Sequence, residues 1–574
     1  SESDNDPFSL SDSLEDPNFV ISENESRSSS SSSEDSISED VSSLELSTLN
    51  DEPMPVESNV ENSDRNEEDD TYQVFDVEWK DPTGNHEEFG FTENSGINPE
   101  LAAALVGASP EDYLSAFIDD EILNVMTEET NLYATQMLLQ DRDVPKYSRL
   151  HAWQPTNKDE IKKFLGILGY MGIVKLPTLR HYWCKRRLFG VSVVAEVMSR
   201  NRFELLLTVW HFSDNQTCPE GDRGYKIEPL INSLVKKFQN VYTPGKEFCI
   251  DETLVPFRGR LIMKQYIPQK THKYGIKLFK LCCENGYTWN IKLYCGKEKD
   301  AGASVPTNVV MKLSEKLLNT GRTIVTDNYY TSLELANKLL DNKTHLLGTL
   351  RANRRGNPKD VVTKKLKPGE IIAKENNRGI CIMKWKDRRD VLMLSTKHTN
   401  TTTTIKRRTG IIEKPLAIVE YNKAKSSIDL SDQMASYSTA LRKTVKWYRK
   451  IALELLLGTA VVNAHFLFKA INDSTMSITD FREIIIESLL FPKSDGEETI
   501  DQPTTAKKSK RMNVHTFQKK KGRAHEVRKY CKGCYEKKLT GLITKNKVPK
   551  VTTYCEDCDK QPHFCIDCFA NNHK

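Results

Sequence analysis

The sequence has no run of about 18 apolar residues, the length that a membrane-spanning helix requires. The nearest stretch, residues 455–468, contains Asn463 and His465 and is typical of a buried core helix. No signal peptide is recognisable, and neither a membrane nor a small-molecule substrate is expected as a partner. Cysteine is scarce over most of the chain, because six of the 13 residues lie between Cys531 and Cys568. This distribution excludes a disulfide scaffold and indicates a reduced intracellular protein.

Basic side chains are nearly missing from residues 1–100, which hold 29 Asp plus Glu against 3 Lys plus Arg. The other 474 residues carry 79 basic against 51 acidic side chains. This excess favours a polyanionic partner, although a merely solvated surface is the alternative. Low apolar content predicts that residues 1–95 form a disordered, acidic, Ser-rich tail. Its serines beside acidic residues are phosphorylation candidates, or the tail is only solubilising.

Hydrophobic periodicity divides the remaining chain into helical and strand-rich parts. The helical part begins near Ser109, a predicted N-cap, with Pro110 at the first helical position. After residue 245, short apolar runs between turn residues predict the strands of a mixed α/β sheet. The predicted parts are a helical domain (96–245), an α/β core in two pieces (246–354 and 421–495), a polar and mostly β insertion (355–420), a basic linker (496–529) and a cysteine-rich module (530–574).

Two of the predicted strands end on an aspartate. Asp251 closes the apolar run 248–250, and Asp327 closes the run in "IVTDNYYTS". If the strands are neighbours, the two carboxylates come close together. Close, buried carboxylates repel each other, so they persist by binding a divalent metal or by sharing a proton. For each aspartate taken alone, a strand-end carboxylate that faces water is the alternative.

The segment "SSIDLSDQM" supplies further acids, Asp429 and Asp432, which lie three residues apart and so share one face of a predicted helix. Ser426 at an N-cap with Asp429 three residues later is also a capping-box-like helix start that needs no catalysis. Acids from two strands and one helix together match the layout of a two-metal phosphoryl-transfer site, in which the ions lie about 4 Å apart.

Five segments of the chain resemble the piggyBac transposase family. They are "MSRNRFELLLTVWHFSDN", "IDETLVPFRGR", "YIPQKTHKYGIKLF", "VTDNYYTS" and "YNKAKSSIDLSDQMASYS", in that order. The resemblance runs from about residue 100 to the C-terminus. It implies a multidomain α/β protein with an RNase H-like catalytic core, and it assigns dimerisation and DNA binding to the helical N-terminal domain.

The resemblance implies that Asp251, Asp327 and Asp429 are catalytic and bind two Mg²⁺ or Mn²⁺ ions, with Asp432 as a further acid at the site. It implies cut-and-paste transposition: nicking at each transposon end, hairpin formation by the freed 3′-OH, and joining to target DNA at TTAA-type sites. Each step is an in-line displacement at phosphorus, which one two-metal site can serve. Double-stranded DNA and a second copy of the chain are the expected partners. Where the family has glycines before the third acid, this chain has Ser426 and Ser427, and the helix start is expected to survive.

Basic residues interleaved with aromatics surround these acids. The candidate DNA contacts are Arg258, Arg260, Lys264, Lys273, Lys277, Arg442, Lys443, Lys446 and Trp447. The cations would neutralise phosphates, although any one of them is equally a solvated charge. Trp447 is the candidate for stacking on an unpaired base, and a core aromatic is its alternative.

The C-terminal module carries three C-x2-C pairs, a spacing typical of structural zinc sites. The expected zinc ligands are Cys531, Cys534, Cys555, Cys558, His563, Cys565, Cys568 and His573, with His515 or His525 as rivals for His563. Eight ligands suit two structural Zn²⁺ ions, and interleaved pairs suggest a cross-brace module like that of the family. Recognition of the transposon end is its expected role, and a reader of histone tails or a ubiquitin ligase is the rival.

The basic linker predicts a nuclear localisation signal or a phosphate-binding arm, with a solvated spacer as the alternative, so a nuclear protein is expected. An active DNA transposase is the leading functional hypothesis. The second is a domesticated DNA-binding regulator without cleavage activity, and a nuclease without strand transfer is the third.

Overall fold

The structure is a computed structural model that describes residues 78–84, 86–139, 148–268, 270, 272–296, 304–407, 410–441, 446–492, 517–520, 522–540, 548–556, 558 and 561–572. The chain divides into two compact units, residues 1–493 and 494–574. The second unit therefore contains the predicted basic linker and cysteine-rich module. Most of that linker and residues 1–77 of the predicted acidic tail lie outside the described residues.

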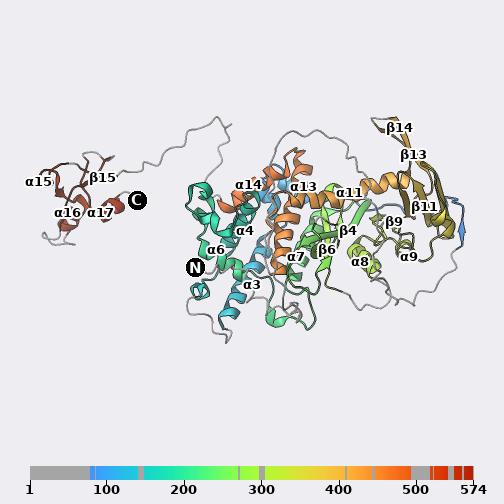
Figure 1. Cartoon of the computed structure of the whole chain (residues 1–574), viewed down its shortest axis with the longest axis horizontal. Coiled ribbons are helices and arrows are strands. Elements are labelled where there is room, and N and C mark those ends of the chain that lie inside the picture. The colour runs from blue at the N-terminus through green and yellow to red at the C-terminus, as the bar shows by residue number, and fades with distance from the viewer. Residues whose placement is uncertain are drawn as a thin grey trace, which may run out of the picture. The chain divides into compact units, whose positions relative to one another are not determined.

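The first part of the larger unit is helical, as its periodicity predicts (Figure 1). Its helices are α1 (Pro99–Leu105), α2 (Pro110–Ser115), α3 (Asp120–Leu139), α4 (Lys158–Ile173), α5 (Val193–Val197), α6 (Arg200–Val209) and α7 (Glu228–Val241), with 3₁₀ turns η2 (Arg149–Ala152), η3 (Leu179–Trp183), η4 (Arg187–Phe189) and η5 (Asn215–Thr217). Ser109 caps α2 in a capping box with Asp112, and Pro110 occupies its first turn, which confirms the predicted start.

A mixed sheet follows, with ten strands among the described residues. Its strands are β1 (Trp79–Lys80), β4 (Glu247–Pro256), β5 (Gln265–Tyr266), β6 (Tyr274–Cys282), β7 (Thr288–Leu293), β8 (Thr323–Thr326), β9 (His345–Thr349), β10 (Ile371–Asn376), β11 (Cys381–Lys386) and β12 (Asp390–Ser395). They are ordered β1-β10-β11-β12-β9-β8-β4-β6-β5, and β7 also pairs with β6. The pairs β4·β8 and β8·β9 are parallel, whereas β4, β6 and β7 form an antiparallel meander.

Helices connect and cover these strands. They are α8 (Val305–Ser314), α9 (Leu333–Asp341), α10 (Lys359–Thr363), α11 (Leu416–Ser436), α12 (Trp447–Leu453), α13 (Ala460–Asn472) and α14 (Ile478–Leu490), with short turns η6 (Glu284–Gly286) and η7 (Glu315–Leu317) and a π-helical turn η8 (Glu454–Thr459) between α12 and α13. Residues 447–472 are long and apolar enough to cross a membrane, but 89% of the apolar window is buried inside the structure. This helix is therefore packed as the core helix that residues 455–468 predict.

The predicted insertion does not form a compact unit of its own. Strands β10 to β12 extend the central sheet, because β12 pairs antiparallel with β9 through Leu394 and Gly348. A separate hairpin follows, made of β13 (Thr402–Arg407) and β14 (Gly410–Pro415). A second small ladder joins β2 (Gly96–Ile97) to β3 (Tyr242–Thr243).

The prediction that residues 1–95 are all disordered is wrong for the part that the structure describes. Trp79 and Lys80 pair with β10, and the backbone N–H of Thr83 donates to Glu375 Oε2 over 3.0 Å. The guanidinium of Arg322, which is fully buried, lies 5.0 Å from the Phe91 ring and pairs with Glu93 at 2.7 Å. Few apolar residues are needed here, because this segment adds to a core that already exists.

The C-terminal unit is small and has its own elements. These are β15 (Phe517–Lys519), α15 (Ala524–Val527), β16 (Lys529–Tyr530), α16 (Lys532–Leu539), β17 (Lys550–Val551), β18 (Thr553–Cys555) and α17 (Ile566–Asn572). Its apolar core is built around Cys531, Cys555, Phe564 and Cys568. A core this small needs a further source of stability, such as a metal.

Candidate active site

Asp251 and Asp327 lie side by side at the end of a parallel ladder. The register pairs Ile250 of β4 with Thr326 of β8, so each aspartate is the next residue after the last paired one. Neighbouring strands run about 4.8 Å apart, which brings these two residues to one edge of the ladder. Asp327 follows β8 as predicted, but Asp251 does not end its strand, because β4 continues to Pro256 in its pairing with β6.

Burial makes this pair of carboxylates unfavourable in the charged form. It raises the pKa of Asp251 to about 8, and the charges of Glu252 and Asp327 add to the effect. Burial also raises the pKa of Asp327, although the backbone N–H of Tyr329 donates to its Oδ1 over 2.9 Å. A divalent cation would relieve this repulsion, so the donor set fits a hard metal ion with oxygen ligands.

A third carboxylate, Glu252, lies beside the pair and was missed by the sequence reasoning. Its Oε2 accepts a hydrogen bond of 3.0 Å from Tyr330 and lies 3.7 Å from Lys277 Nζ. Lys277 Nζ in turn lies 4.4 Å from the centre of the Tyr329 ring. The sequence offered one signal for Glu252: it directly follows Asp251, on a strand that pairs with β6 and its lysine Lys277.

Asp429 lies on α11, which crosses the same part of the sheet (Figure 1). The apolar face of α11 is made of Ala417, Ile418, Tyr421, Ala424 and Ile428, and it packs in one cluster with Cys249, Val325 and Leu347. Cys249 is two residues before Asp251 on β4, so α11 covers the sheet face of Asp251. Asp429 is exposed at the flank of this helix.

Within the described residues, Asp251, Asp327 and Asp429 do not form a group whose ligand atoms all lie within 4.8 Å of one another. The structure therefore brings Asp251 and Asp327 together and leaves Asp429 on the neighbouring helix. The predicted helix start near Ser426 is wrong: α11 begins at Leu416, and the Ser426 hydroxyl donates to Lys423 O within the helix. Ser426 is not an N-cap because the preceding segment has enough apolar contacts to be helical as well.

Asp432 is not a free metal ligand in this structure. Its Oδ1 accepts hydrogen bonds from Thr253 Oγ1 over 2.7 Å and from Lys280 Nζ over 3.2 Å. Lys280 is fully buried, and its Nζ also lies 3.9 Å from Glu454 Oε1. Burial lowers the pKa of Lys280, but Asp432 and Glu454 outweigh it and raise that pKa above its ordinary value. Asp432 thus links α11 to β4 and β6. Lys280 was not predicted from the sequence, because it lies within the apolar run of residues 278–283.

In the C-terminal unit, four predicted zinc ligands converge. The ligand atoms of Cys531, Cys534, Cys565 and Cys568 all lie within 4.8 Å of one another. The sulfur of Cys531 lies 3.6 Å from that of Cys565, and the sulfur of Cys534 lies 3.6 Å from that of Cys568. Four thiolates at about 2.3 Å from a tetrahedral zinc ion have sulfurs roughly 3.8 Å apart, so the geometry fits zinc.

The other predicted zinc ligands are not part of this group. His563 is buried, and its Nδ1 lies 3.2 Å from Val551 O, an interaction that orients the ring within the unit. Cys555 and Cys558 are separate from the group of four, and His573 lies outside the described residues. His515 and the side chain of His525 also lie outside them.

The chain is similar to known transposases and transposase-derived proteins. A family model described as Transposase IS4 matches residues 109–465. The human piggyBac transposable element-derived protein 3 is 26% identical over 398 residues, which cover 66% of this chain and 64% of the relative. The human piggyBac transposable element-derived protein 2 is 25% identical over 434 residues, covering 71% of this chain and 69% of the relative.

A piggyBac transposase solved by cryo-EM in a synaptic complex with hairpin DNA has a similar structure, with a TM-score of 0.62 and 25% identity. The alignment covers 83% of this chain and all of that one. This chain belongs to the piggyBac transposase family. It spans less than two thirds of the length of protein 3, of which it covers 64%.

In this piggyBac-family chain, the predicted DNA contacts fall into three groups. Arg258, Arg260 and Lys273 are exposed, and Lys264 is half-buried. Lys277 and Lys446 are buried, the first against Glu252 and the second near the Tyr133 ring, so neither presents its charge to solvent. Arg442 and Lys443 lie outside the described residues.

Trp447 is only 1% exposed and packs in the main apolar core. Its predicted role in base stacking is therefore corrected to the alternative, a core aromatic that anchors α12. The basic residues around it in sequence gave no information on which face of the helix would be buried.

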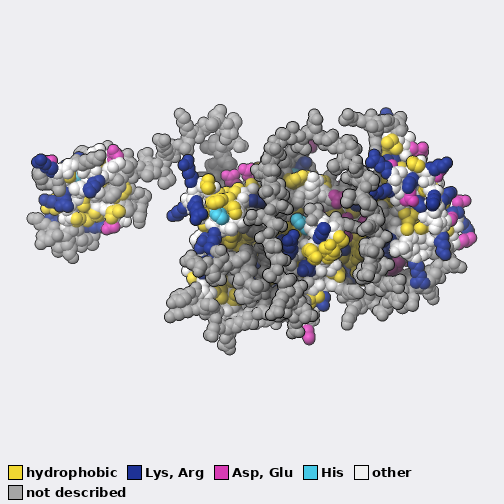
Figure 2. All heavy atoms as spheres, in the orientation of Figure 1, with side chains coloured by type: hydrophobic (Ala, Val, Ile, Leu, Met, Phe, Trp, Pro, Cys, Tyr) yellow, Lys and Arg dark blue, Asp and Glu magenta, His cyan; other side chains and the backbone are white. Residues whose placement is uncertain are grey.

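On the face shown in Figure 2, Lys and Arg side chains lie over the helical part and over the end of the sheet near β11, β13 and β14.

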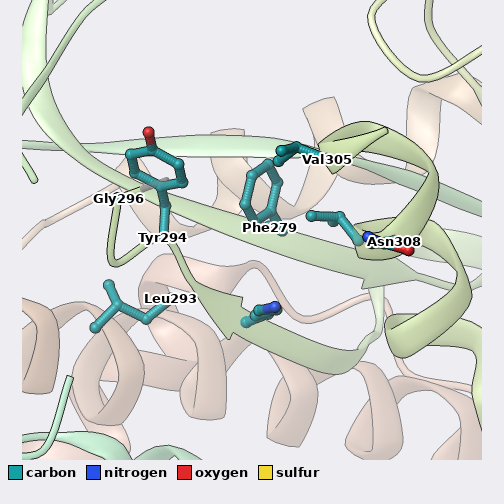
Figure 3. Close-up of a pocket in the computed structure, with 8 residues that line it drawn as sticks. Phe279, Leu293, Tyr294, Gly296, Val305 and Asn308 are labelled. Atoms are coloured by element: carbon teal, nitrogen blue, oxygen red, sulfur yellow. The ribbon is translucent and has the colours of Figure 1, made fainter. Parts of the chain in front are cut away.

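A small cavity between β6, β7 and α8 is separate from the carboxylates (Figure 3). Its lining residues are Phe279, Lys292, Leu293, Tyr294, Gly296, Val305, Asn308 and Val309. The cavity volume of about 20 Å³ holds roughly one water molecule. None of its lining residues is an acid.

Proposed function

We propose that this chain is a cut-and-paste DNA transposase that excises a transposon through 3′-OH nicking and hairpin intermediates and integrates it at TTAA-type targets. The observation that carries the proposal is the half-buried pair Asp251 and Asp327 at the end of the β4·β8 ladder. The solved relative in complex with hairpin DNA supports the type of intermediate. An antiparallel meander followed by two parallel strands is compatible with the RNase H-like core that the resemblance implies.

Asp251 and Asp327, with Asp429 from α11, would hold two Mg²⁺ or Mn²⁺ ions. Such ions activate the attacking oxygen and stabilise the leaving oxygen of each displacement. The residues of the chain supply the positioning: Tyr329 N–H orients Asp327, and the Asp432–Lys280 pair fixes α11. Thr253 adds a second hydrogen bond to Asp432 and so links α11 to β4 itself.

The C-terminal unit would bind two structural zinc ions and recognise the transposon end, and the expected assembly is a nuclear homodimer on double-stranded DNA. The exposed cations Arg258, Arg260 and Lys273 support contact with phosphates near the site. The cysteine group fits the first zinc ion, since its four sulfurs already have tetrahedral spacing.

The test is incubation of the purified chain with duplexes that carry its own transposon ends, in Mg²⁺, followed by sequencing of the products. The wild type should give nicked, hairpin and joined products, whereas Asp327→Asn should bind the ends and give none. A second candidate, a DNA-binding regulator without cleavage, is suggested by the human relatives, which are named as element-derived proteins. It is favoured if wild type and Asp327→Asn both bind the ends and both leave them intact.

A further inference from the structure

Two tyrosines form an exposed aromatic pair on the hairpin that extends from the catalytic strands. Tyr266 and Tyr274 are 55% and 47% exposed. Their ring centres lie 4.7 Å apart with an angle of 40° between the planes. Tyr437 and Phe491 are also exposed in this unit, at 44% and 47%. What distinguishes Tyr266 and Tyr274 is that two exposed rings lie against each other.

A role in hairpin stability explains only part of this arrangement. Tyr266 and Tyr274 are directly opposite each other in the β5·β6 ladder, and such a pair stabilises a hairpin by roughly 0.2–1 kcal/mol. That contribution uses the faces that the rings turn to each other. About half of each residue stays exposed, so both rings remain accessible to a partner.

The pair lies on the same sheet face as the catalytic aspartate. Along β6, residues 274, 276, 278 and 280 alternate to one face, and Lys280 is directly opposite Asp251 in the β4·β6 ladder. Tyr274 and Lys280 are six steps apart along the strand, a distance of about 20 Å at 3.3 Å per residue. This corresponds to about six nucleotides of a DNA strand at 3.4 Å per step.

Basic residues flank the tyrosines in sequence. Lys273 precedes Tyr274, Arg258 and Arg260 lie between β4 and β5, and all three are exposed. Lys264 Nζ donates to Gly259 O over 3.0 Å and lies 5.6 Å from the centre of the Tyr274 ring. Aromatic rings set among cations that track a backbone are the combination by which proteins bind single-stranded nucleic acid.

We propose that Tyr266 and Tyr274 form a platform on which unpaired bases of a DNA strand stack, about 20 Å along β6 from the Asp251–Asp327 site. The inference rests on the proposed function, because a transposase that opens DNA ends produces unpaired bases next to its active site. Every base has a π face, so the platform binds without regard to sequence. It takes over the role that the sequence assigned to Trp447.

The test measures binding of the full chain, in EDTA, to a fluorescein-labelled 20-nucleotide strand of mixed sequence and to the matching duplex, by anisotropy. The double variant Tyr266→Leu/Tyr274→Leu should bind the single strand at least about tenfold more weakly, because stacking contributes about 1–3 kcal/mol per base and 1.4 kcal/mol is a factor of ten. Its affinity for the duplex should change by less than about twofold. Tyr266→Phe/Tyr274→Phe keeps the rings and should bind like the wild type.

An abasic strand completes the cycle. The wild type and the Phe variant should bind the abasic strand as weakly as the Leu variant binds the intact strand. The Leu variant should bind the abasic and intact strands with equal affinity. Arg258→Gln is the charge control and should weaken single strand and duplex alike. The platform is refuted if the Leu variant loses affinity equally for both DNAs, or if wild type binds abasic and intact strands equally.

Metal-dependent nicking of transposon ends is measured on the same wild-type preparation. This assay separates the transposase proposal from the tyrosine platform. Nicking together with single-strand binding that does not depend on the tyrosine rings overturns the platform alone. Ring-dependent binding without nicking overturns the transposase proposal and leaves the platform in place. If the Leu variant melts at a lower temperature than the wild type, its weaker binding could come from unfolding. The platform is then tested by comparing the affinities of the wild type and the Phe variant for intact and abasic DNA.

Discussion

Among single residues, Asp251 carries the largest consequence for pH. Burial and the neighbouring charges of Glu252 and Asp327 raise its pKa to about 8 in the folded chain, against about 3.9 when unfolded. The folded state therefore binds more protons between these values, and stability without metal falls as the pH rises from about 4 to about 8.

We predict that Asp251→Asn melts at a higher temperature than the wild type at pH 8 in EDTA. The gain is a few kcal/mol, because each pKa unit corresponds to about 1.4 kcal/mol. The difference should vanish at pH 4, where the wild-type carboxyl is protonated, and Mg²⁺ should stabilise the wild type more than the variant. Thermal unfolding at the two pH values checks this, and equal destabilisation at both would contradict it.

A substitution of Trp447 should destabilise the protein, because its side chain lies in the apolar core. Trp447→Ala should lower the free energy of unfolding by about 3–5 kcal/mol, as removal of a large buried aromatic does. Trp447→Phe should lose less. Urea titration followed by circular dichroism measures both. A Trp447→Ala variant that is as stable as wild type but fails to bind single-stranded DNA would restore the base-stacking interpretation.

The sequence predicts single residues unevenly. It placed Asp251 and Asp327 on neighbouring strands and grouped Cys531, Cys534, Cys565 and Cys568, because apolar runs and C-x2-C pairs are local patterns. It missed Glu252 and Lys280 and assigned Trp447 to the surface, because the face that a side chain presents is set by packing against distant elements. Lys280 meets Asp432 across 152 positions of sequence, a pairing that no local pattern contains.

Among the elements, α11 decides whether Asp429 reaches the two strand aspartates. Besides its apolar face, α11 is held on the sheet by the ion pair between the fully buried Lys280 and the half-buried Asp432, with Glu454 nearby. A buried pair that loses one partner leaves an uncompensated charge, which costs about 3–5 kcal/mol.

We predict that Lys280→Met lowers the free energy of unfolding by about 3–5 kcal/mol and that adding Asp432→Asn recovers part of the loss. Lys374→Met is the matched control, because its partner Asp81 is 91% exposed and such a pair contributes about 1 kcal/mol or less. A double-mutant cycle in urea measures the coupling. Additive losses for Lys280→Met and Asp432→Asn would show that the two side chains do not depend on each other.

Strands and helices of strong periodicity were predictable, whereas boundaries and connections were not. The runs that predict β4, β6, β8 and β11 all appear in the structure. The start of α11 was misplaced, because Ser426 is a good cap in isolation but the segment from Leu416 packs on Cys249 and Val325. Residues 78–95 read as disordered because their partners, including Glu375 and Arg322, lie more than 200 positions away.

For the whole molecule, the division into residues 1–493 and 494–574 predicts two separate responses to metal removal. A zinc chelator should unfold the smaller unit, since its core consists largely of cysteines, and should leave the melting of the larger unit unchanged. Cys531→Ser should do the same, whereas Cys218→Ser in the larger unit is the control. Calorimetry with zinc quantification measures this. A chelator that leaves both transitions in place would contradict a structural zinc site.

The account as a whole depends on a shared divalent-metal site at Asp251 and Asp327, completed by Asp429 of α11. The most direct measurement is a crystal structure of the chain with Mn²⁺ and a transposon-end duplex, with anomalous difference maps at the manganese edge. The account predicts strong peaks between these three carboxylates, and their loss in Asp327→Asn. Peaks elsewhere, or Asp429 turned away from an occupied site, would contradict it.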